Sequence, residues 1–167
     1  RDVAPSRGLG DVYKRQLHCP YILMHLRGNP ATMQSLCDYS EFNNDVTAAV
    51  ISELSARVAE LRQMGVSDLI VDPGFGFSKT MEQNYELMRN LGVMGEAFNA
   101  PLLVGVSRKS MVCRALGVLP DKALNGTTSL HTIALLEGAS ILRVHDVGAA
   151  VEARTIVQHT FPNHTHH

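Results

Sequence analysis

The sequence predicts an α/β fold made of four consecutive strand–helix units, which corresponds to half of a (β/α)8 barrel. Two observations carry this prediction. Short apolar runs alternate with longer stretches of helical periodicity, and a polar cluster follows each of the short runs. The strand ends of a barrel meet at one mouth, whereas a doubly wound sheet concentrates its ligand contacts at one switch point. The even spread of polar clusters over four strands therefore favours the barrel.

Four apolar runs are expected to form the strands. They lack the alternation of a half-exposed strand, which is typical of parallel strands that are covered on both faces. The expected strands span residues 21–24, 69–71, 102–106 and 141–144.

Helical stretches lie between and after these strands, with apolar residues at three- and four-residue steps. The expected stripes are Val46, Val50, Leu54, Val58 and Leu61 in the first helix, Leu87, Leu91, Met94 and Phe98 in the second, Leu130, Ile133, Ala134 and Leu136 in the third, and Val147, Val151 and Val157 in a weaker fourth.

The composition excludes several classes of partner. The 167 residues suit one domain, and 15 basic against 16 acidic residues are dispersed along the chain, with pI near 6.8. A polyanion binder shows a basic face or stripe, so no nucleic-acid partner is expected. No apolar run approaches the roughly 18 residues of a spanning helix, so no membrane partner is expected either. Cys19, Cys37 and Cys113 form neither a disulfide framework nor a zinc site, which indicates a cytoplasmic protein.

The two ends of the chain differ from its centre. Residues 1–16 are polar and aperiodic and resemble translated sequencing-adaptor sequence, so we interpret them as a non-native leader, with a genuine disordered leader as the alternative. Residues 17–160 then form a partial barrel domain, and residues 161–167 form a polar, histidine-rich tail. A metal bound by His164, His166 and His167 is not favoured.

The run DPGFGFSK, residues 72–79, places an acid at the end of a strand and before a compact glycine-rich loop. A buried carboxylate needs donors or a cation, and a ligand with adjacent N–H groups would satisfy Asp72. The alternative is that Asp72 caps the following helix. Phe75 and Phe77 are either part of the loop core or a wall beside an aromatic substrate, and Asn84 is given no role.

Two further clusters carry positive charge. Ser107, Arg108 and Lys109 precede an expected helix, where cations and backbone N–H groups could bind an anion; Lys109 could instead donate to a ring heteroatom, and a solvated loop is the alternative to both. Alternation places Arg143 and His145 on one face of the last strand.

The planar fork of an arginine such as Arg143 suits phosphate, and a protonated His145 would support the anion. Asp146 is expected to pair with one of these two residues, and a purely structural ion pair is the alternative. Met24, at the end of the first strand, is either a packing residue or a soft wall for a flat ligand.

These segments resemble dihydropteroate synthases of the pterin-binding family. YILMHLRGNPATMQ, DPGFGFSKT, PLLVGVSRKSMV and GASILRVHDV stand in the order and spacing of the last four strands of that family, over roughly residues 20–160. The resemblance implies the C-terminal half of a TIM barrel and an enzyme that joins para-aminobenzoate to a dihydropterin carrying a methyl diphosphate.

The resemblance also implies a role for each site residue. Asp72 would hold the amino-pyrimidinone edge of the pterin, and Lys109 would contact the pterin ring. Arg143, Val144 and His145 would lie at the diphosphate, with Lys109, Arg143 and His145 as the catalytic residues. The pterin slot would be lined by Met24, Phe77 and Gly105, and Ser107 and Arg108 would lie toward para-aminobenzoate.

Other expectations follow from the same resemblance. A magnesium ion would be held by an asparagine in the absent first half, so no metal ligand is expected here. The parent enzyme would be a homodimer, and this chain alone would be inactive. Because four parallel strands of an unclosed barrel leave two edge strands with unpaired N–H and C=O groups, this chain alone is also expected to self-associate. The alternatives are a pterin-binding methyltransferase domain and a non-catalytic pterin-binding product of a truncated gene.

Overall fold

The structure, a computed structural model, describes residues 20–29 and 31–162, and it confirms the predicted alternation of strands and helices. The elements are β1 (Tyr21–Met24), η1 (Met33–Ser35), η2 (Ser40–Phe42), α2 (Val46–Gln63), β2 (Leu69–Asp72), α3 (Met81–Arg89), α4 (Leu91–Phe98), β3 (Leu103–Val104), α5 (Ser110–Leu116), η3 (Pro120–Lys122), α6 (Leu124–Leu136), β4 (Ile141–Leu142) and α7 (Val147–Thr160). The leader, residues 1–16, and most of the histidine-rich tail lie outside the described residues.

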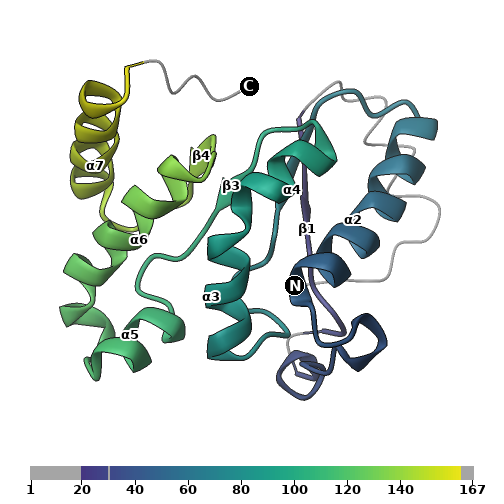
Figure 1. Cartoon of the computed structure of the whole chain (residues 1–167), viewed down its shortest axis with the longest axis horizontal. Coiled ribbons are helices and arrows are strands. Elements are labelled where there is room, and N and C mark those ends of the chain that lie inside the picture. Colours follow the sequence, from purple (N-terminus) through teal and green to yellow (C-terminus); the bar gives the residue numbers. More distant parts are fainter. Residues whose placement is uncertain (1–19, 30, 163–167) are drawn as a thin grey trace.

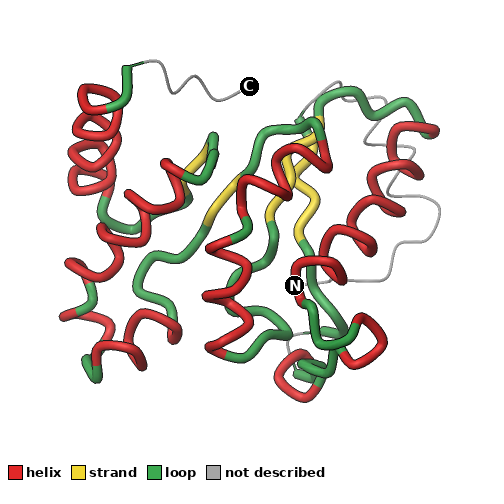
Figure 2. The backbone as a smooth tube through the Cα atoms, viewed as in Figure 1, coloured by secondary structure: helices red, strands yellow, loops and turns green. Residues whose placement is uncertain are grey.

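The strands pair in chain order and run parallel; they are drawn in yellow in Figure 2. β1 pairs with β2, so that Met24 lies opposite Asp72, and β3 pairs with β4. A single bridge between Val71 and Leu102 joins the two pairs. Each strand therefore lies next to the strand that follows it in the sequence.

β3 and β4 are shorter than predicted, because the backbone hydrogen bonds between the two strands are replaced near their ends by a bond to the Ser107 side chain. One backbone bond continues past β4, from Arg143 N to Val104 O at 2.9 Å. Beyond it, His145 N donates to Ser107 Oγ at 3.2 Å. The two segments thus stay together without further strand pairing.

The helices cover one face of these strands. Leu23, Val71, Leu102 and Val104 belong to the hydrophobic core, together with residues of α2, α3 and α4, which lie beside the strands (Figure 1). On the opposite face Ile22 is 52% exposed, and Met24 and Ile70 are half-buried. The prediction that both faces are covered is therefore wrong for β1, although Asp72 and Leu103 on the same face are buried.

The apolar stripe of α2 is confirmed, since all five of its predicted residues are buried. The second predicted helix is instead two helices, α3 and α4, although its four predicted apolar residues are buried. Asn90 interrupts it, with φ −112° and ψ 17°, and its side chain donates to Thr47 Oγ1 at 2.9 Å. This hydrogen bond to α2 stabilises the interruption between α3 and α4.

The stripes of the last two helices are only partly correct. In α6, Leu130 and Ala134 are buried, but Ile133 is exposed. In α7, Val157 is buried, but Val147 and Val151 are exposed; the face that packs consists of Ala150, Ala153 and Val157. Small alanines let α7 approach its neighbour α6 closely, so the packing face is not the one with the largest side chains. None of the helices in residues 20–29 and 31–162 has the length and apolar character needed to cross a membrane.

Candidate functional site

Asp72 ends β2 and is buried, with 2% of its surface exposed. Its Oδ1 accepts a hydrogen bond from Gly74 N at 2.8 Å. The alternative that Asp72 caps the next helix is wrong, because Thr80 caps α3 and accepts from Gln83 N. Asp72 is therefore not the N-cap of α3, and its second carboxylate oxygen does not bind the start of that helix.

The glycine-rich loop after Asp72 turns tightly against β1. A Cβ at Gly74, whose φ is +73°, would lie 1.9 Å from the backbone oxygen of His25, so only glycine fits there. Phe77 N donates to Gly74 O at 3.1 Å. The loop thus closes on itself directly after the acid.

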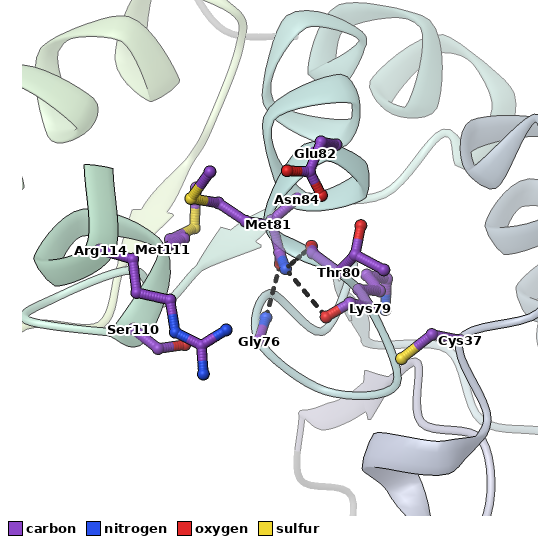
Figure 3. Close-up of a pocket in the computed structure, with 10 residues that line it drawn as sticks. All are labelled: Cys37, Gly76, Lys79, Thr80, Met81, Glu82, Asn84, Ser110, Met111 and Arg114. Carbon is purple, nitrogen blue, oxygen red and sulfur yellow. Dashed lines mark hydrogen bonds between the residues drawn. The ribbon is translucent and has the colours of Figure 1, made fainter.

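Asn84, which the sequence reasoning left without a role, braces this loop from α3. It is buried, and its Oδ1 accepts from Gly76 N at 2.6 Å, while its Nδ2 donates to Thr80 O at 2.6 Å. Figure 3 shows the Asn84 amide directed at the loop backbone. A buried asparagine one turn into a helix is therefore part of the site's support.

The two phenylalanines of the loop have different surroundings. Phe75 is fully buried and belongs to the core. Phe77 is half-buried, and the Lys109 ammonium lies 4.6 Å from its ring centroid, a cation–π distance. Lys109 Nζ also donates to Phe75 O. The loop therefore connects the strand end that carries Asp72 with the one that carries Lys109.

Arg143 reaches the same point from β4. Its Nη2 lies 3.9 Å from Asp72 Oδ2, which is an ion pair but too long for a hydrogen bond. The guanidinium lies against Gly105, where a Cβ would come within 2.9 Å of Nη2. The Arg143 side chain is 56% exposed. Asp72 and Arg143 thus face each other on the side of the strands that the helices leave uncovered.

Burial and charge compete at this point. Burial raises the pKa of Asp72. The hydrogen bond from Gly74 N and the positive charges of Arg143, Lys109 and Lys79 lower it, but by less. Burial also lowers the pKa of Lys109 to about 8, with the charge of Asp72 raising it and that of Arg143 lowering it. One buried carboxyl group is thus surrounded by three basic side chains.

A cavity of about 220 Å³ lies beside this ion pair, and it brings together six of the predicted site residues. They are Gly105, Ser107, Lys109, Arg143, Val144 and His145. Met24 adjoins Asp72 through the strand register.

Asp146 does not pair with Arg143 or His145, so that prediction is wrong. Its carboxylate accepts two hydrogen bonds from Arg108, both at 2.8 Å, and these bonds lower the pKa of Asp146. Arg108 has φ +53° and also donates to Pro120 O at 2.7 Å. Arg108 does not line the cavity; its bonds to Asp146 join the ends of β3 and β4 instead.

A second cavity, of about 460 Å³, lies between the glycine-rich loop and the start of α5 (Figure 3). Its lining residues are Cys37, Gly76, Lys79, Thr80, Met81, Glu82, Asn84, Ser110, Met111 and Arg114. Sequence reasoning did not point to this cavity, because Cys37, the loop and α5 are distant in the chain. Among the described residues, no group of three or more His, Cys, Asp or Glu could hold a metal ion.

Comparison with known proteins identifies the family. The family described as pterin binding enzyme matches residues 13–145. The dihydropteroate synthase of Escherichia coli K12 is 43% identical over 143 residues, which are 84% of this chain and 49% of that protein. The chain thus spans about half the length of the curated relatives it matches.

Solved structures agree. The dihydropteroate synthase of Yersinia pestis, solved as a sulfonamide drug complex, matches with a TM-score of 0.86 and 35% identity, over 93% of this chain and 56% of that one. The Thermus thermophilus enzyme, solved in complex with 4-aminobenzoate and with 6HMPPP, matches with TM-scores of 0.83 and 0.84 at 34% and 33% identity. These matches cover 89% and 91% of this chain, and 57% and 59% of those chains. With the family match extending over most of its length, this chain belongs to the pterin-binding enzyme family.

Proposed function

We propose that this chain is the half of a dihydropteroate synthase that binds the pterin edge and the diphosphate. The observation that carries the proposal is the convergence of Asp72, Lys109 and Arg143, from three successive strand ends, on the uncovered face of the strands. The similarity to dihydropteroate synthases over most of the chain supports it.

The fold part of the proposal is that the chain supplies the last four βα units of a TIM barrel. Support comes from the sequential order of four parallel strands and from the helices that cover one face. In a barrel, consecutive strands pair and the helices form an outer ring. The uncovered face would then be the barrel interior, which the other four units would close.

The buried carboxyl group of Asp72 suits the amino-pyrimidinone edge of a pterin, which presents adjacent N–H donors. Oδ1 already has the Gly74 N–H, so Oδ2, which lies 3.9 Å from Arg143 Nη2, is the atom that would meet the ligand. Lys109, with its ammonium over Phe77, would contact the ring from the side. Met24 and Gly105 would complete the slot, because a glycine leaves room for a flat ligand next to the strand.

Arg143 and His145 would bind the diphosphate. The exposed guanidinium of Arg143 can offer two parallel N–H groups to phosphate oxygens, and His145 and Val144 lie in the same cavity. In the reaction, the amine nitrogen of para-aminobenzoate bonds to the pterin methylene carbon, and the carbon–oxygen bond to diphosphate breaks. The electron pair leaves with the diphosphate, and the amine nitrogen loses a proton. The protein's contribution is to position both substrates and to stabilise the departing charge.

Ser107 Oγ accepts from His145 N, and the Arg108 guanidinium donates to Asp146. Because both side chains already have partners, these two residues would contribute to the para-aminobenzoate site by shaping the loop on that side. The Thermus relative solved with 4-aminobenzoate supports this substrate. Magnesium, whose ligand we expect outside this chain, would neutralise charge on the diphosphate. A cytoplasmic homodimer is our proposal for the parent enzyme.

The chain expressed alone is expected to self-associate. Among the described residues, β1 pairs only with β2 and β4 only with β3, and the uncovered face carries apolar side chains such as Ile22; strand edges and apolar faces of this kind recruit other chains. Sedimentation of residues 17–167 at low micromolar concentration should show oligomers or insoluble protein. A stable monomer that unfolds cooperatively would contradict the half-barrel.

The activity is best tested in a completed enzyme, a hybrid in which this chain replaces the matching half of the Escherichia coli relative. Given pterin diphosphate and para-aminobenzoate, the hybrid should form dihydropteroate and release one diphosphate per product. A folded hybrid that binds pterin without forming product would favour the non-catalytic alternative. Methyl transfer to a thiol acceptor from a methylated pterin would favour the methyltransferase alternative.

A further inference from the structure

Lys79 lies beneath the loop that carries Asp72, and its side chain is almost fully buried, with 4% of the residue exposed. Its Nζ lies 3.1 Å from Gly74 O, 3.0 Å from Phe77 O and 2.9 Å from His25 Nδ1. An ammonium group has three N–H donors and no acceptor. Each of the three donors therefore has one acceptor.

The partners of His25 extend this arrangement to α2. Since the ammonium group of Lys79 only donates, His25 Nδ1 accepts, and we assign the ring proton to Nε2. That atom lies 3.0 Å from Glu53 Oε2, which accepts from it. Arg27 donates to the other carboxylate oxygen of Glu53. Burial lowers the pKa of His25 to about 4, as does the charge of Lys79, so at neutral pH the ring is an uncharged link between Lys79 and Glu53.

The two loop carbonyls that Lys79 binds stand at the ends of the turn after Asp72. Phe77 N donates to Gly74 O, and Gly74 N donates to Asp72 Oδ1. Lys79 is thus two hydrogen bonds away from the carboxylate. It is absent from the cavity that holds Lys109 and Arg143, so it acts on the ligand through the loop.

We propose that Lys79 is a positioning residue whose ammonium group, anchored through His25 to Glu53, holds the turn from Gly74 to Phe77 so that Asp72 presents its second oxygen to the pterin. This inference rests on the proposed function, because it assumes that the pterin binds at Asp72. It concerns a side chain that contacts neither the pterin nor the diphosphate.

The charge on Lys79 makes the proposal testable by pH. Burial lowers the pKa of Lys79 to about 7, while the charges of Asp72 on β2, Glu53 on α2 and Cys37 before η2 raise it and that of Lys109 lowers it. His25 contacts the ammonium group directly, Arg27 pairs with Glu53, and the Tyr39 hydroxyl donates to Ser78 O beside Lys79. Above pH 7 the ammonium loses one donor, and one of its three acceptors loses its bond. Pterin affinity should therefore fall as the pH rises.

The first test compares Lys79→Met with the unsubstituted completed enzyme by calorimetry with pterin diphosphate. At about pH 6 the variant should bind at least about fivefold more weakly, as expected for the loss of a charge-assisted bond. The ratio of the two affinities should shrink toward about twofold at about pH 9, where Lys79 of the unsubstituted protein is neutral. Lys109 titrates in both proteins, so its own effect on binding is shared by the two affinities, and only its coupling to Lys79 differs between them. Lys122→Met, at an exposed position on η3, is the matched control. A ratio that stays constant with pH would overturn the proposal.

The second test leaves the loop untouched and alters the anchor. Glu53→Gln keeps an oxygen that accepts from His25 Nε2 but removes the negative charge and the oxygen that accepts from Arg27, so the pH midpoint of pterin binding should move to lower pH. Glu60→Gln, on the exposed side of the same helix, should leave the midpoint unchanged. An unchanged midpoint in Glu53→Gln would overturn the proposal even if Lys79→Met fails to fold.

A third measurement does not depend on pterin binding. Nitrogen-15 spectra of the unliganded completed enzyme should show His25 protonated at Nε2, and Lys79→Met should change the signal of Nδ1. A proton on Nδ1 in the unsubstituted protein would contradict the Lys79 arrangement itself. Absence of pterin binding in the unsubstituted protein, with the His25 tautomer as expected, would instead contradict the proposed function.

Discussion

Asp72→Asn in the completed enzyme is expected to weaken pterin binding by more than tenfold. The amide oxygen of asparagine can still accept the Gly74 N–H, so the loop should keep its shape. The amide nitrogen, however, would place a donor against the N–H donors of the pterin edge, and hydrogen bonds to a charged group contribute about 1.5–3 kcal/mol. Tenfold corresponds to about 1.4 kcal/mol, so the expected loss is at least of this size.

Calorimetry with a dihydropterin that lacks the diphosphate measures this effect without a contribution from Arg143 at the leaving group. Asp121→Asn is the matched control, since Asp121 is exposed on η3. Pterin affinity that is equal in Asp72→Asn and in the control would exclude Asp72 as the pterin-binding acid.

Arg143→Ala is expected to weaken binding of the pterin diphosphate about tenfold more than binding of a pterin without diphosphate. The guanidinium is more than half exposed, so its loss should cost the fold little, whereas bidentate bonds to phosphate are among the strong hydrogen bonds of proteins. Both ligands should lose some affinity, because Asp72 also loses its ion pair.

The measurement is a pair of calorimetric titrations on each variant, with Arg154→Ala on the exposed side of α7 as the control. Equal losses for the two ligands would mean that Arg143 serves only to pair with Asp72, and the diphosphate would then need another site.

The parts of the fold that sequence reasoning predicted are those that depend on local periodicity. The apolar stripe of α2 follows from residue spacing alone. Strand β2 follows from a short apolar run, and Pro73 and Gly74 after Asp72 indicate where it ends. The break at Asn90 was not predictable, because it is held by a bond to Thr47 on another helix. The prediction of the buried face of α7 was wrong for the same kind of reason, because the face that packs on α6 carries alanines in place of Val147 and Val151.

The site shows the same division. Sequence reasoning placed Asp72, Lys109 and Arg143 at strand ends, and parallel strands bring such ends together. The partner of Asp146 is Arg108, 38 positions earlier and at a positive φ, and no pattern of residue types indicates it. Lys79 was overlooked because its three acceptors are two backbone oxygens and a histidine 54 positions away. A lysine that follows a glycine-rich loop and precedes a helix cap is the signal that could have drawn attention to it.

The central claim is that one pterin diphosphate binds across Asp72 and Arg143, with its pterin edge on the carboxylate and its diphosphate on the guanidinium. A crystal structure of the completed enzyme with pterin diphosphate tests it most directly. We expect the amino-pyrimidinone edge within about 3.2 Å of Asp72 Oδ2, the ring beside Lys109 and Phe77, and the diphosphate on Arg143 and His145. A pterin bound elsewhere, with Asp72 still facing only Arg143, would contradict the account.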